Sequence, residues 1–345
     1  MNFIKPPRLS VGDTVGIVSS SWGGPSAYPH IYENGLSILR SLGLQIKEYP
    51  SARADDRFLS ANPRARAADI NDAFLDPEVK AIISSIGGDD AIRILPFLDR
   101  EVIKGNPKIL MGYSDTTTLL TFINQLGLVT FNGPSVMAGF SQAAALPETF
   151  IQHIKALLFS VEEEYEYFGF GVYCDGYLDW RKLENTGKTK ELKRDDGWRF
   201  IQGSELVAGE LYGGCIEVLE VLNGTPFWPH NEFWNGKVLF FETSEEKPSI
   251  ERVRRMLRNY GMQGALDLVA AVLFGRARDY SDSEKMDFDQ MILGVIEGEF
   301  GRRNLPIVTN MDFGHTDPQF ILPLGVRAAI DCSRQSFKLL ESPVC

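Results

Sequence analysis

The sequence predicts an α/β protein whose first half is a doubly wound, mostly parallel β-sheet and whose second half is a further α/β or α+β domain. Short β-rich runs alternate with helical patterns from the start of the chain to about residue 160, which is typical of βαβ units. The chain has 345 residues, which exceeds the size at which one hydrophobic core usually stops growing. We therefore expect two domains of ordinary size.

The first half contains five apolar runs of strand length, with helical patterns between and after them. The expected strands are Thr14–Val18, Gln45–Tyr49, Val79–Ser84, Lys108–Met111 and Val129–Phe131. The expected helices are Tyr32–Leu42, Pro63–Phe74, Asp89–Asp99, Thr116–Gln125 and Pro147–Phe159. In the first of these helices, leucines recur at helical spacing, so one face can pack against the sheet.

The pattern changes between about residues 160 and 205. Acidic residues, aromatic residues and the polar stretch Asn185–Asp196 occur there, and no period of 2 or 3.6 residues persists. A connection with a long exposed loop is the simplest interpretation. We therefore expect a first domain over residues 1–165, a connection over residues 166–205 and a second domain over residues 206–345.

The alternation resumes in the second half of the chain. Strands are expected at Val238–Glu242, Leu268–Phe274, Pro306–Asn310 and Gly325–Asp331. Helices are expected at Ser249–Tyr260 and Asp287–Glu299. This arrangement indicates a second α/β or α+β domain.

Composition excludes several classes of protein. The formal net charge of −11 argues against a nucleic-acid polymer as partner, because such binding requires Lys and Arg to neutralise phosphates. No run approaches the roughly 20 apolar residues that span a bilayer, and Asp13 interrupts the apolar start before it reaches signal-peptide length. The four cysteines lack the spacing of a zinc site or the density of a disulfide scaffold. We expect a cytoplasmic protein with reduced thiols and no membrane partner.

Ser114 is a candidate nucleophile. The segment Lys108–Leu120 reads as an apolar strand, a turn and the opening of a helix, and a serine at such a turn can project its hydroxyl above the sheet. The helix N-terminus supplies backbone N–H groups for an oxyanion, and Gly112 permits a tight backbone path. The alternative is that Ser114 or Asp115 is only a helix N-cap.

A nucleophilic serine needs a base, and the sequence contains four histidines. His153 falls within an apparent amphipathic helix, and His230 follows Trp228 and Pro229, so packing or surface roles are favoured for both. His315 instead lies in a loop that follows an expected strand and contains Gly314. Catalytic groups are often placed in such loops, although a solvent-exposed loop histidine fits the pattern as well.

Glu242 is a candidate for the carboxylate that orients the base. It ends the apolar run Val238–Glu242, so its side chain can lie half buried at the edge of a sheet. The alternative is that Glu242 belongs to a solvated acidic cluster with Glu245 and Glu246.

Several short motifs occur together in a fixed order across most of the chain. They are Ile86-Gly-Gly-Asp-Asp90, Gly112-Tyr-Ser-Asp115, Gly209-x-x-x-Gly213-Gly214, Phe241-Glu242 and Gly314-His315-Thr-x-Pro318, followed by Leu322-Pro-Leu-Gly325. This ordered set resembles the LD-carboxypeptidases and their relatives, the microcin C self-immunity peptidases.

The resemblance implies a Rossmann-like N-terminal domain that carries the nucleophile and a C-terminal domain that carries the glutamate and the histidine. The triad positions are then Ser114, Glu242 and His315, at a cleft between the domains. The resemblance further implies that the backbone N–H groups of Gly88 and Asp115 form the oxyanion hole, and that the protein is a homodimer. No metal or organic cofactor is expected, and the sequence contains no H-E-x-x-H motif.

The residues in these motifs are more similar to those of the microcin immunity branch. The murein-trimming branch usually has Arg where this chain has Ile86, and Trp180 and Trp198 are aromatic candidates for stacking on a nucleobase. The expected substrate-binding residues are Gly87, Gly214, Cys215, Trp180 and Trp198. Cys215 stands where relatives commonly have Asn, which removes an amide side chain, and a packed thiol is the favoured interpretation.

Three functions remain open from the sequence. The leading hypothesis is a serine peptidase or amidohydrolase that cleaves an amide in a small peptidyl-nucleotide or aminoacyl-nucleotide substrate. The second is a murein tetrapeptide LD-carboxypeptidase in cell-wall recycling. The third is a small-ligand-binding protein without catalysis, in which Gly87 and Gly88 hold an anion.

Overall fold

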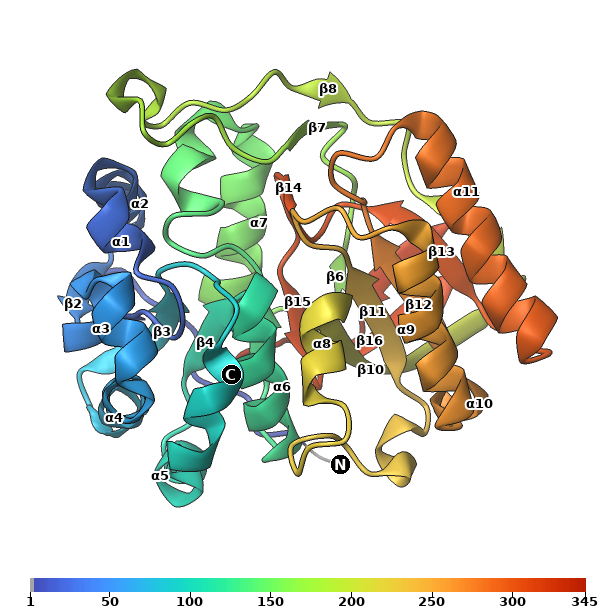
Figure 1. The fold of residues 1–345 in the computed structure, drawn as a ribbon, viewed down its shortest axis with the longest axis horizontal. Coiled ribbons are helices and arrows are strands. Elements are labelled where there is room, and N and C mark those ends of the chain that lie inside the picture. Colours follow the sequence, from blue (N-terminus) through green and yellow to red (C-terminus); the bar gives the residue numbers. More distant parts are fainter. Residues whose placement is uncertain (1–2) are drawn as a thin grey trace.

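The computed structural model describes residues 3–345 and contains a six-stranded sheet built mainly from the first half of the chain (Figure 1). Its strand order is β15 (Leu322–Leu324), β5 (Thr130–Asn132), β4 (Ile109–Gly112), β3 (Val79–Ser84), β1 (Thr14–Val18) and β2 (Gln45–Glu48). The five strands from the first half pair in parallel, and β15 joins β5 antiparallel. The predicted mostly parallel sheet is confirmed.

The second sheet is mixed. Its order is β6 (Tyr165–Glu166), β17 (Ser336–Leu339), β16 (Arg327–Asp331), β10 (Leu206–Cys215), β11 (Val238–Glu242), β12 (Ala271–Gly275), β13 (Ile307–Met311) and β9 (Arg199–Gln202). The central strands β10 to β13 are parallel and the outer ones are antiparallel. A third, small sheet contains β14 (Thr316–Asp317), β7 (Val172–Asp175) and β8 (Lys193–Arg194). The protein is therefore of mixed α/β class in both halves.

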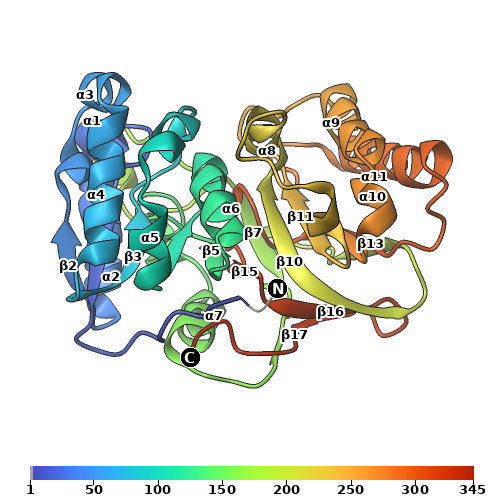
Figure 2. The same cartoon turned by 90° about the horizontal axis from the view of Figure 1, so that it is seen from below.

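Helices lie beside both large sheets (Figures 1 and 2). In the first half they are α1 (Gly24–Ala27), α2 (Pro29–Ser41), α3 (Asp56–Ala61), α4 (Pro63–Leu75), α5 (Arg100–Gly105), α6 (Thr117–Gln125) and α7 (Glu148–Phe159). In the second half they are α8 (Ile216–Leu222), α9 (Ile250–Met262), α10 (Ala265–Leu268) and α11 (Asp282–Leu293). Leu36 and Leu39 of α2 are buried, as the helical spacing predicts. Within residues 3–345, no helix has the length and apolar character needed to cross a bilayer.

The prediction of one helix over Asp89–Asp99 is wrong. The segment instead forms a 3₁₀ helix at Ala91–Phe97, with Pro96 inside it, and α5 follows. Proline cannot donate the backbone hydrogen bond that an α-helix needs. Asp99 then caps α5, because its carboxylate accepts hydrogen bonds from the N–H groups of Glu101 and Val102.

Two boundaries in the second half also differ from the predictions. The predicted strand Leu268–Phe274 begins as the end of α10, and β12 starts only at Ala271. The predicted helix Asp287–Glu299 starts earlier, at Asp282, because Ser281 and Glu284 form a capping box there. Its last turn, Gly294–Glu299, is π-helical.

The C-terminal stretch returns to the first sheet, which the sequence did not predict. Leu322–Leu324 forms β15 and pairs with β5, after which Gly325 turns the chain into β16 of the second sheet (Figure 2). Gly325 has φ +87, and a Cβ there would contact Phe3 at 2.7 Å. The two large sheets are therefore joined by continuous backbone directly beyond the loop that contains His315.

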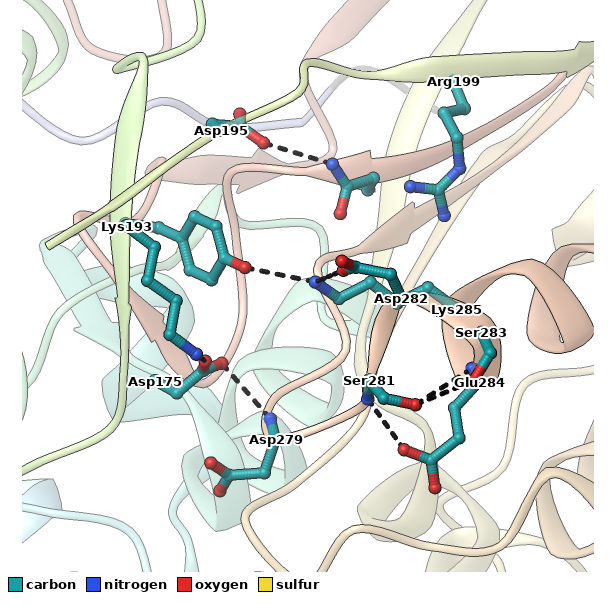
Figure 3. Close-up of polar contacts among 12 residues, drawn as sticks. Asp175, Lys193, Asp195, Arg199, Asp279, Ser281, Asp282, Ser283, Glu284 and Lys285 are labelled. Atoms are coloured by element: carbon teal, nitrogen blue, oxygen red, sulfur yellow. Dashed lines mark hydrogen bonds and ion pairs between the residues drawn. The ribbon is translucent and has the colours of Figure 1, made fainter.

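The connection over residues 166–205 is more ordered than the predicted loop. It contributes β7, β8 and β9, and polar contacts fasten it to the second half of the chain (Figure 3). Asp175 on β7 accepts hydrogen bonds from Lys193 Nζ at 2.6 Å and from the backbone N–H of Asp279 at 3.2 Å (Figure 3). Asp195 accepts from Asn310 at 3.2 Å.

A buried arginine strengthens the same attachment. Arg276, which follows β12, is fully buried and lies 2.7 Å from Asp195 Oδ2 and 2.9 Å from Asp312 Oδ1. Its guanidinium also covers the ring of Tyr173 on β7, with 4.3 Å to the centroid. One cation therefore compensates two buried carboxylates and holds β7 in place.

We predict that Arg276→Met lowers the free energy of unfolding by about 3–5 kcal/mol, because it leaves buried carboxylates without a compensating cation. Urea unfolding followed by tryptophan fluorescence measures the change. Arg334→Met is the control, because Arg334 is exposed and lies 3.8 Å from its partner Asp331. The control is expected to leave the midpoint essentially unchanged. Equal midpoints for the two variants would refute the role of Arg276.

Candidate active site

Ser114 lies at a sharp turn between β4 and α6. The strand ends at Gly112, a 3₁₀ turn covers Ser114–Thr116, and α6 begins at Thr117. Ser114 has φ +58, a conformation that residues with a side chain rarely adopt. A Cβ on Gly112 would come within 2.8 Å of Thr116, so the turn requires glycine there. This strand–turn–helix geometry is the one that presents a nucleophile in α/β hydrolases.

A cavity of about 780 Å³ lies at this turn. It is lined by Ser114 and His315, by the glycine pair Gly87 and Gly88, and by side chains from both halves of the chain, including Trp180 and Glu245. Concave sites of this size typically hold small ligands. The cavity therefore unites Ser114 and His315, two of the three residues predicted to form the triad.

Glu242 and His315 are in direct contact behind this cavity. Glu242 Oε2 lies 2.6 Å from His315 Nδ1, and the Glu242 side chain is fully buried at the end of β11. The alternative that Glu242 is solvated is therefore wrong. A carboxylate on Nδ1 fixes the orientation of the ring and leaves Nε2 as the nitrogen that faces away from it.

The close approach of Glu242 and His315 depends on Gly314. Gly314 has φ +100, and a Cβ there would lie 2.7 Å from Glu242 Cβ and 2.8 Å from Glu242 Oε2. Any side chain at this position would displace the carboxylate or the loop. The ring of Tyr113 closes the other side of the imidazole, in an edge-to-face contact with 4.9 Å between ring centroids.

A second carboxylate lies at the far nitrogen of the same ring. Glu245 Oε2 is 2.9 Å from His315 Nε2. Burial alone would lower the pKa of His315, but the charges of Glu242 and Glu245 outweigh it and raise the pKa to about 10. The close contact with His315 and the charge of its ring in turn lower the pKa of Glu245 to about 2.

Gly87 lies against Ser114, and Gly88 lies against Ser21. A Cβ on Gly87 would be 3.0 Å from Ser114 Oγ and 3.4 Å from the backbone nitrogen of Asp115. Gly88 has φ +150, and a Cβ there would collide with Ser21. Within residues 3–345, the backbone N–H groups of Gly88 and Asp115 donate to no acceptor. The residues that carry these two unused donors are Asp115, which follows the serine in the chain, and Gly88, which lines the same cavity as Ser114.

Aromatic side chains form one wall of the cavity. Trp180 from the connection lies parallel to Trp22, with 6.5 Å between ring centroids and 10° between planes. Tyr28 and Tyr177 contact the edge or face of Trp180 at 5.7 Å and 5.2 Å. Since Trp180 is only partly buried, its ring is available to a ligand.

Three residues predicted to bind substrate lie elsewhere. Trp198 donates a hydrogen bond from Nε1 to Asp312 at 2.7 Å and packs on Phe320, away from the cavity. Gly214 lies against Thr117, and Cys215 is fully buried with its thiol 3.5 Å from Glu217 Oε2. These three residues shape the protein around the site and do not line it.

Several residues that line the cavity were not predicted from the sequence. Trp22 and Ser21 follow β1, at the carboxyl end of a parallel strand, where ligands of α/β proteins usually bind. Glu245 was grouped with solvated acids, although it follows Glu242 by only three residues. Arg278 follows β12 and carried no recognisable pattern in the sequence.

An α/β fold in which a carboxylate–imidazole pair and a strand–turn–helix serine share one cavity is typical of hydrolases. Comparison with known families identifies the protein further. The LD-carboxypeptidase N-terminal domain model matches residues 15–133, and the LD-carboxypeptidase C-terminal domain model matches residues 208–330. The chain belongs to the LD-carboxypeptidase family, and it is a serine carboxypeptidase-type hydrolase.

Relatives from both branches of the family are similar to the chain. The microcin C7 self-immunity protein MccF of Escherichia coli is 30% identical over 96% of this chain and 94% of its own length. A probable murein peptide carboxypeptidase of Bacillus subtilis is also 30% identical, over 96% of this chain and 93% of its own length. The structure of MccF in complex with glutamyl sulfamoyl guanosine has a TM-score of 0.88 and 29% identity, and it covers 99% of both chains.

We predict that Gly314→Ala lowers the free energy of unfolding by about 2–4 kcal/mol, because strain at positive φ adds to the collision with Glu242. Gly12→Ala is the matched control, since Gly12 has φ +97 and open space around its Cα. The control should cost only the backbone strain, about 1–2 kcal/mol. Chemical denaturation of both variants checks the difference, and equal losses would show that the site tolerates the added methyl group.

Proposed function

We propose that the protein hydrolyses an amide bond through a triad of Ser114, Glu242 and His315. The observation that carries this proposal is the 2.6 Å contact between buried Glu242 and His315 Nδ1, beside a cavity that His315 shares with Ser114. Glu242 orients the imidazole and stabilises the imidazolium that forms during reaction. His315 Nε2 then faces the cavity as the proton acceptor.

The reaction proceeds in two balanced steps. His315 takes the proton from Ser114 Oγ as Oγ bonds to the carbonyl carbon, and the C–N bond breaks when the same proton passes to the leaving nitrogen. Water then attacks the carbonyl carbon of the acyl-enzyme ester and gives one proton to His315. His315 passes this proton to Ser114 Oγ as the C–Oγ bond breaks, which releases the acid and restores Ser114 and neutral His315. The reaction consumes one water molecule and needs no oxidant or reductant.

The oxyanion is assigned to two backbone donors. The N–H groups of Gly88 and Asp115 have no acceptor among the described residues, Gly87 approaches Ser114 closely, and Gly88 lines the same cavity. Preorganised donors of this kind stabilise the charge that develops on the carbonyl oxygen. We assign Gly87 to the same site, because only a residue without a side chain leaves room for substrate beside Ser114 Oγ.

The substrate is proposed to be an aminoacyl or peptidyl nucleotide. The aromatic wall around Trp180 offers a flat, partly exposed surface, and base–aromatic stacking tolerates every base. Solved relatives with this fold were obtained with glutamyl sulfamoyl guanosine and with aspartyl sulfamoyl adenosine. As part of the same proposal, the enzyme acts in the cytoplasm as a homodimer.

A murein tetrapeptide is the second candidate substrate. The similarity to a probable murein peptide carboxypeptidase favours it. Ile86 argues against it, because the arginine that murein-trimming relatives usually carry there could meet a substrate carboxylate. The cavity contains Arg278 as an alternative cation, so both substrates need to be measured.

We predict that Ser114→Ala, Glu242→Gln and His315→Gln each lower kcat substantially, on the order of 10⁴-fold for Ser114→Ala, because triad members act as a unit. Turnover of aspartyl sulfamoyl adenosine and of a murein tetrapeptide is measured by chromatography. A fluorophosphonate probe should label the wild-type protein at Ser114.

Ser333→Ala is the control for this series, because Ser333 is an exposed serine on the far turn after β16. It should retain wild-type turnover and labelling. Unchanged turnover in Ser114→Ala would contradict the serine mechanism. The branch is identified by the compound that the wild-type protein hydrolyses and that Ser114→Ala does not hydrolyse.

We predict that Trp180→Ala raises KM for aspartyl sulfamoyl adenosine by roughly 5- to 100-fold, because a stacked base contributes about 1–3 kcal/mol. Trp180→Phe keeps an aromatic face and should recover most of the loss. Steady-state kinetics separates KM from kcat. An equal KM in both variants and wild type would place the base away from this wall.

A further inference from the structure

Glu245 occupies the position that the proposed mechanism needs for proton transfer. His315 Nε2 is the nitrogen that takes the Ser114 proton, yet Glu245 Oε2 lies 2.9 Å from it. The contact is poorly aligned, since Nε2 makes no hydrogen bond with any described residue. It is therefore an ion pair that a better-placed partner can replace.

Charge around the imidazole favours its protonated form in the free enzyme. Glu242 faces Nδ1 from β11, Glu245 faces Nε2 from the following loop, and buried Asp317 lies nearby on β14. Arg278 lines the same cavity, and its charge helps to lower the pKa of Glu245. The neighbouring ring is Tyr113, whose hydroxyl bonds to Tyr177 at 2.8 Å.

A protonated imidazole cannot serve as the general base. Because the charges of Glu242 and Glu245 raise the pKa of His315, the protonated ring predominates over the neutral ring in the free enzyme near neutral pH. The apparent activity is proportional to the fraction of enzyme molecules in which the His315 imidazole is neutral. The enzyme therefore gains activity when Glu245 leaves Nε2.

The two glutamates differ in their freedom to move. The Glu242 side chain is fully buried, whereas the Glu245 side chain is 55% exposed. Buried Glu217 anchors the start of the loop, because its Oε1 accepts from the N–H and hydroxyl of Ser244 at 3.0 Å and 2.7 Å. Glu245 is the next residue after this anchor, so its side chain can turn toward the cavity while Glu242 stays in place.

The cavity lining favours a cation as the competing partner. Five acidic residues line it, namely Asp56, Asp89, Asp90, Glu245 and Glu246, against the single guanidinium of Arg278 among the described lining residues. Asp90 is already paired with buried Arg66 at 2.5 Å. Glu245 is paired with His315 and Glu246 with Arg252. Asp56 and Asp89 then remain against Arg278 among the described lining residues, and this small excess of negative charge favours a positively charged ligand group.

We propose that Glu245 is a specificity-determining residue that pairs with His315 in the free enzyme and exchanges this partner for an ammonium group on the acyl part of the substrate. The exchange frees Nε2 to receive the Ser114 proton. This inference rests on the proposed function and adds the substrate class, an acyl group that carries a free ammonium near the scissile carbonyl. Substrates without that cation leave the ion pair intact and react slowly.

The test compares wild type, Glu245→Gln and Glu246→Gln. The substrates are aspartyl sulfamoyl adenosine and its analogue in which a hydrogen replaces the α-amino group. Wild type is expected to prefer the amino compound over the deaminated analogue by at least about 100-fold in kcat/KM. Glu245→Gln should raise kcat/KM for the deaminated analogue at least about tenfold at pH 7.5, because lowering the pKa of His315 by one unit raises the fraction of neutral imidazole about tenfold. In Glu245→Gln, the acid limb of the pH profile of kcat/KM should lie at least about one pH unit lower than in wild type.

Glu246→Gln is the matched control, because it removes the same charge from the same loop while its partner is Arg252, at 3.6 Å. It should shift the acid limb by less than half as much as Glu245→Gln does. Equal shifts of the acid limb in both variants would mean that the imidazole responds only to the net charge of the loop, which would overturn the proposal. The absence of a shift in both variants would overturn it as well.

A second readout separates this inference from the proposed function. ¹⁵N-histidine NMR titration of the free proteins reports the ionisation of His315 without any turnover. The His315 resonance should titrate at lower pH in Glu245→Gln than in wild type, and an unchanged titration would overturn the Glu245–His315 pairing. Absence of turnover and of Ser114 labelling in wild type would instead overturn the hydrolase proposal while leaving the pairing measurable.

Discussion

The contact between the buried carboxylate of Glu242 and His315 Nδ1 is the interaction on which the rest of the site depends. A buried carboxylate is costly unless a charged or hydrogen-bonding partner meets it. Here the partner arrives on a loop that only Gly314 allows to approach so closely. One 2.6 Å contact therefore joins the end of β11 to the loop before β14 and orients the imidazole.

Both sheets contribute to the site through the carboxyl ends of their parallel strands. Ser114 follows β4 and Gly87 follows β3 in the first sheet, while Glu242 ends β11 in the second. Loops at these ends converge because parallel strands point the same way. Strand β15 follows His315 shortly in the chain and pairs with the first sheet through backbone hydrogen bonds, so it connects the two sheets. The relative position of serine and histidine is thus set by sheet pairing.

Local sequence patterns predicted the elements that local forces determine. The strands Thr14–Val18, Val79–Ser84 and Val238–Glu242 have the predicted bounds, because each is an apolar run fully specified by its own residues. The turn at Ser114 was also predicted from its neighbours. Pairing of β15 with β5 could not be, since a three-residue strand gains its stability from a partner almost two hundred positions away.

The same limit applies to the residues around the imidazole. Glu242 and Glu245 are both acids in one short segment, and periodicity cannot tell which is buried. The structure distinguishes them by what each side chain meets, a glycine loop for Glu242 and the open cavity for Glu245. Trp180 and Trp198 present the same problem, because both lie in a connection without regular period. Only the fold directs Trp180 to the cavity and Trp198 to Asp312.

Cys215 acts on the site through packing. It pairs in register with Glu242 across β10 and β11, and its thiol reaches Glu217, the residue that anchors Ser244. Burial is the main cause that raises the pKa of this thiol well above its usual range, so it remains a neutral, packed group. Cys215 therefore lies beside Glu242 in the sheet and contacts the glutamate that anchors Ser244, the residue before Glu245.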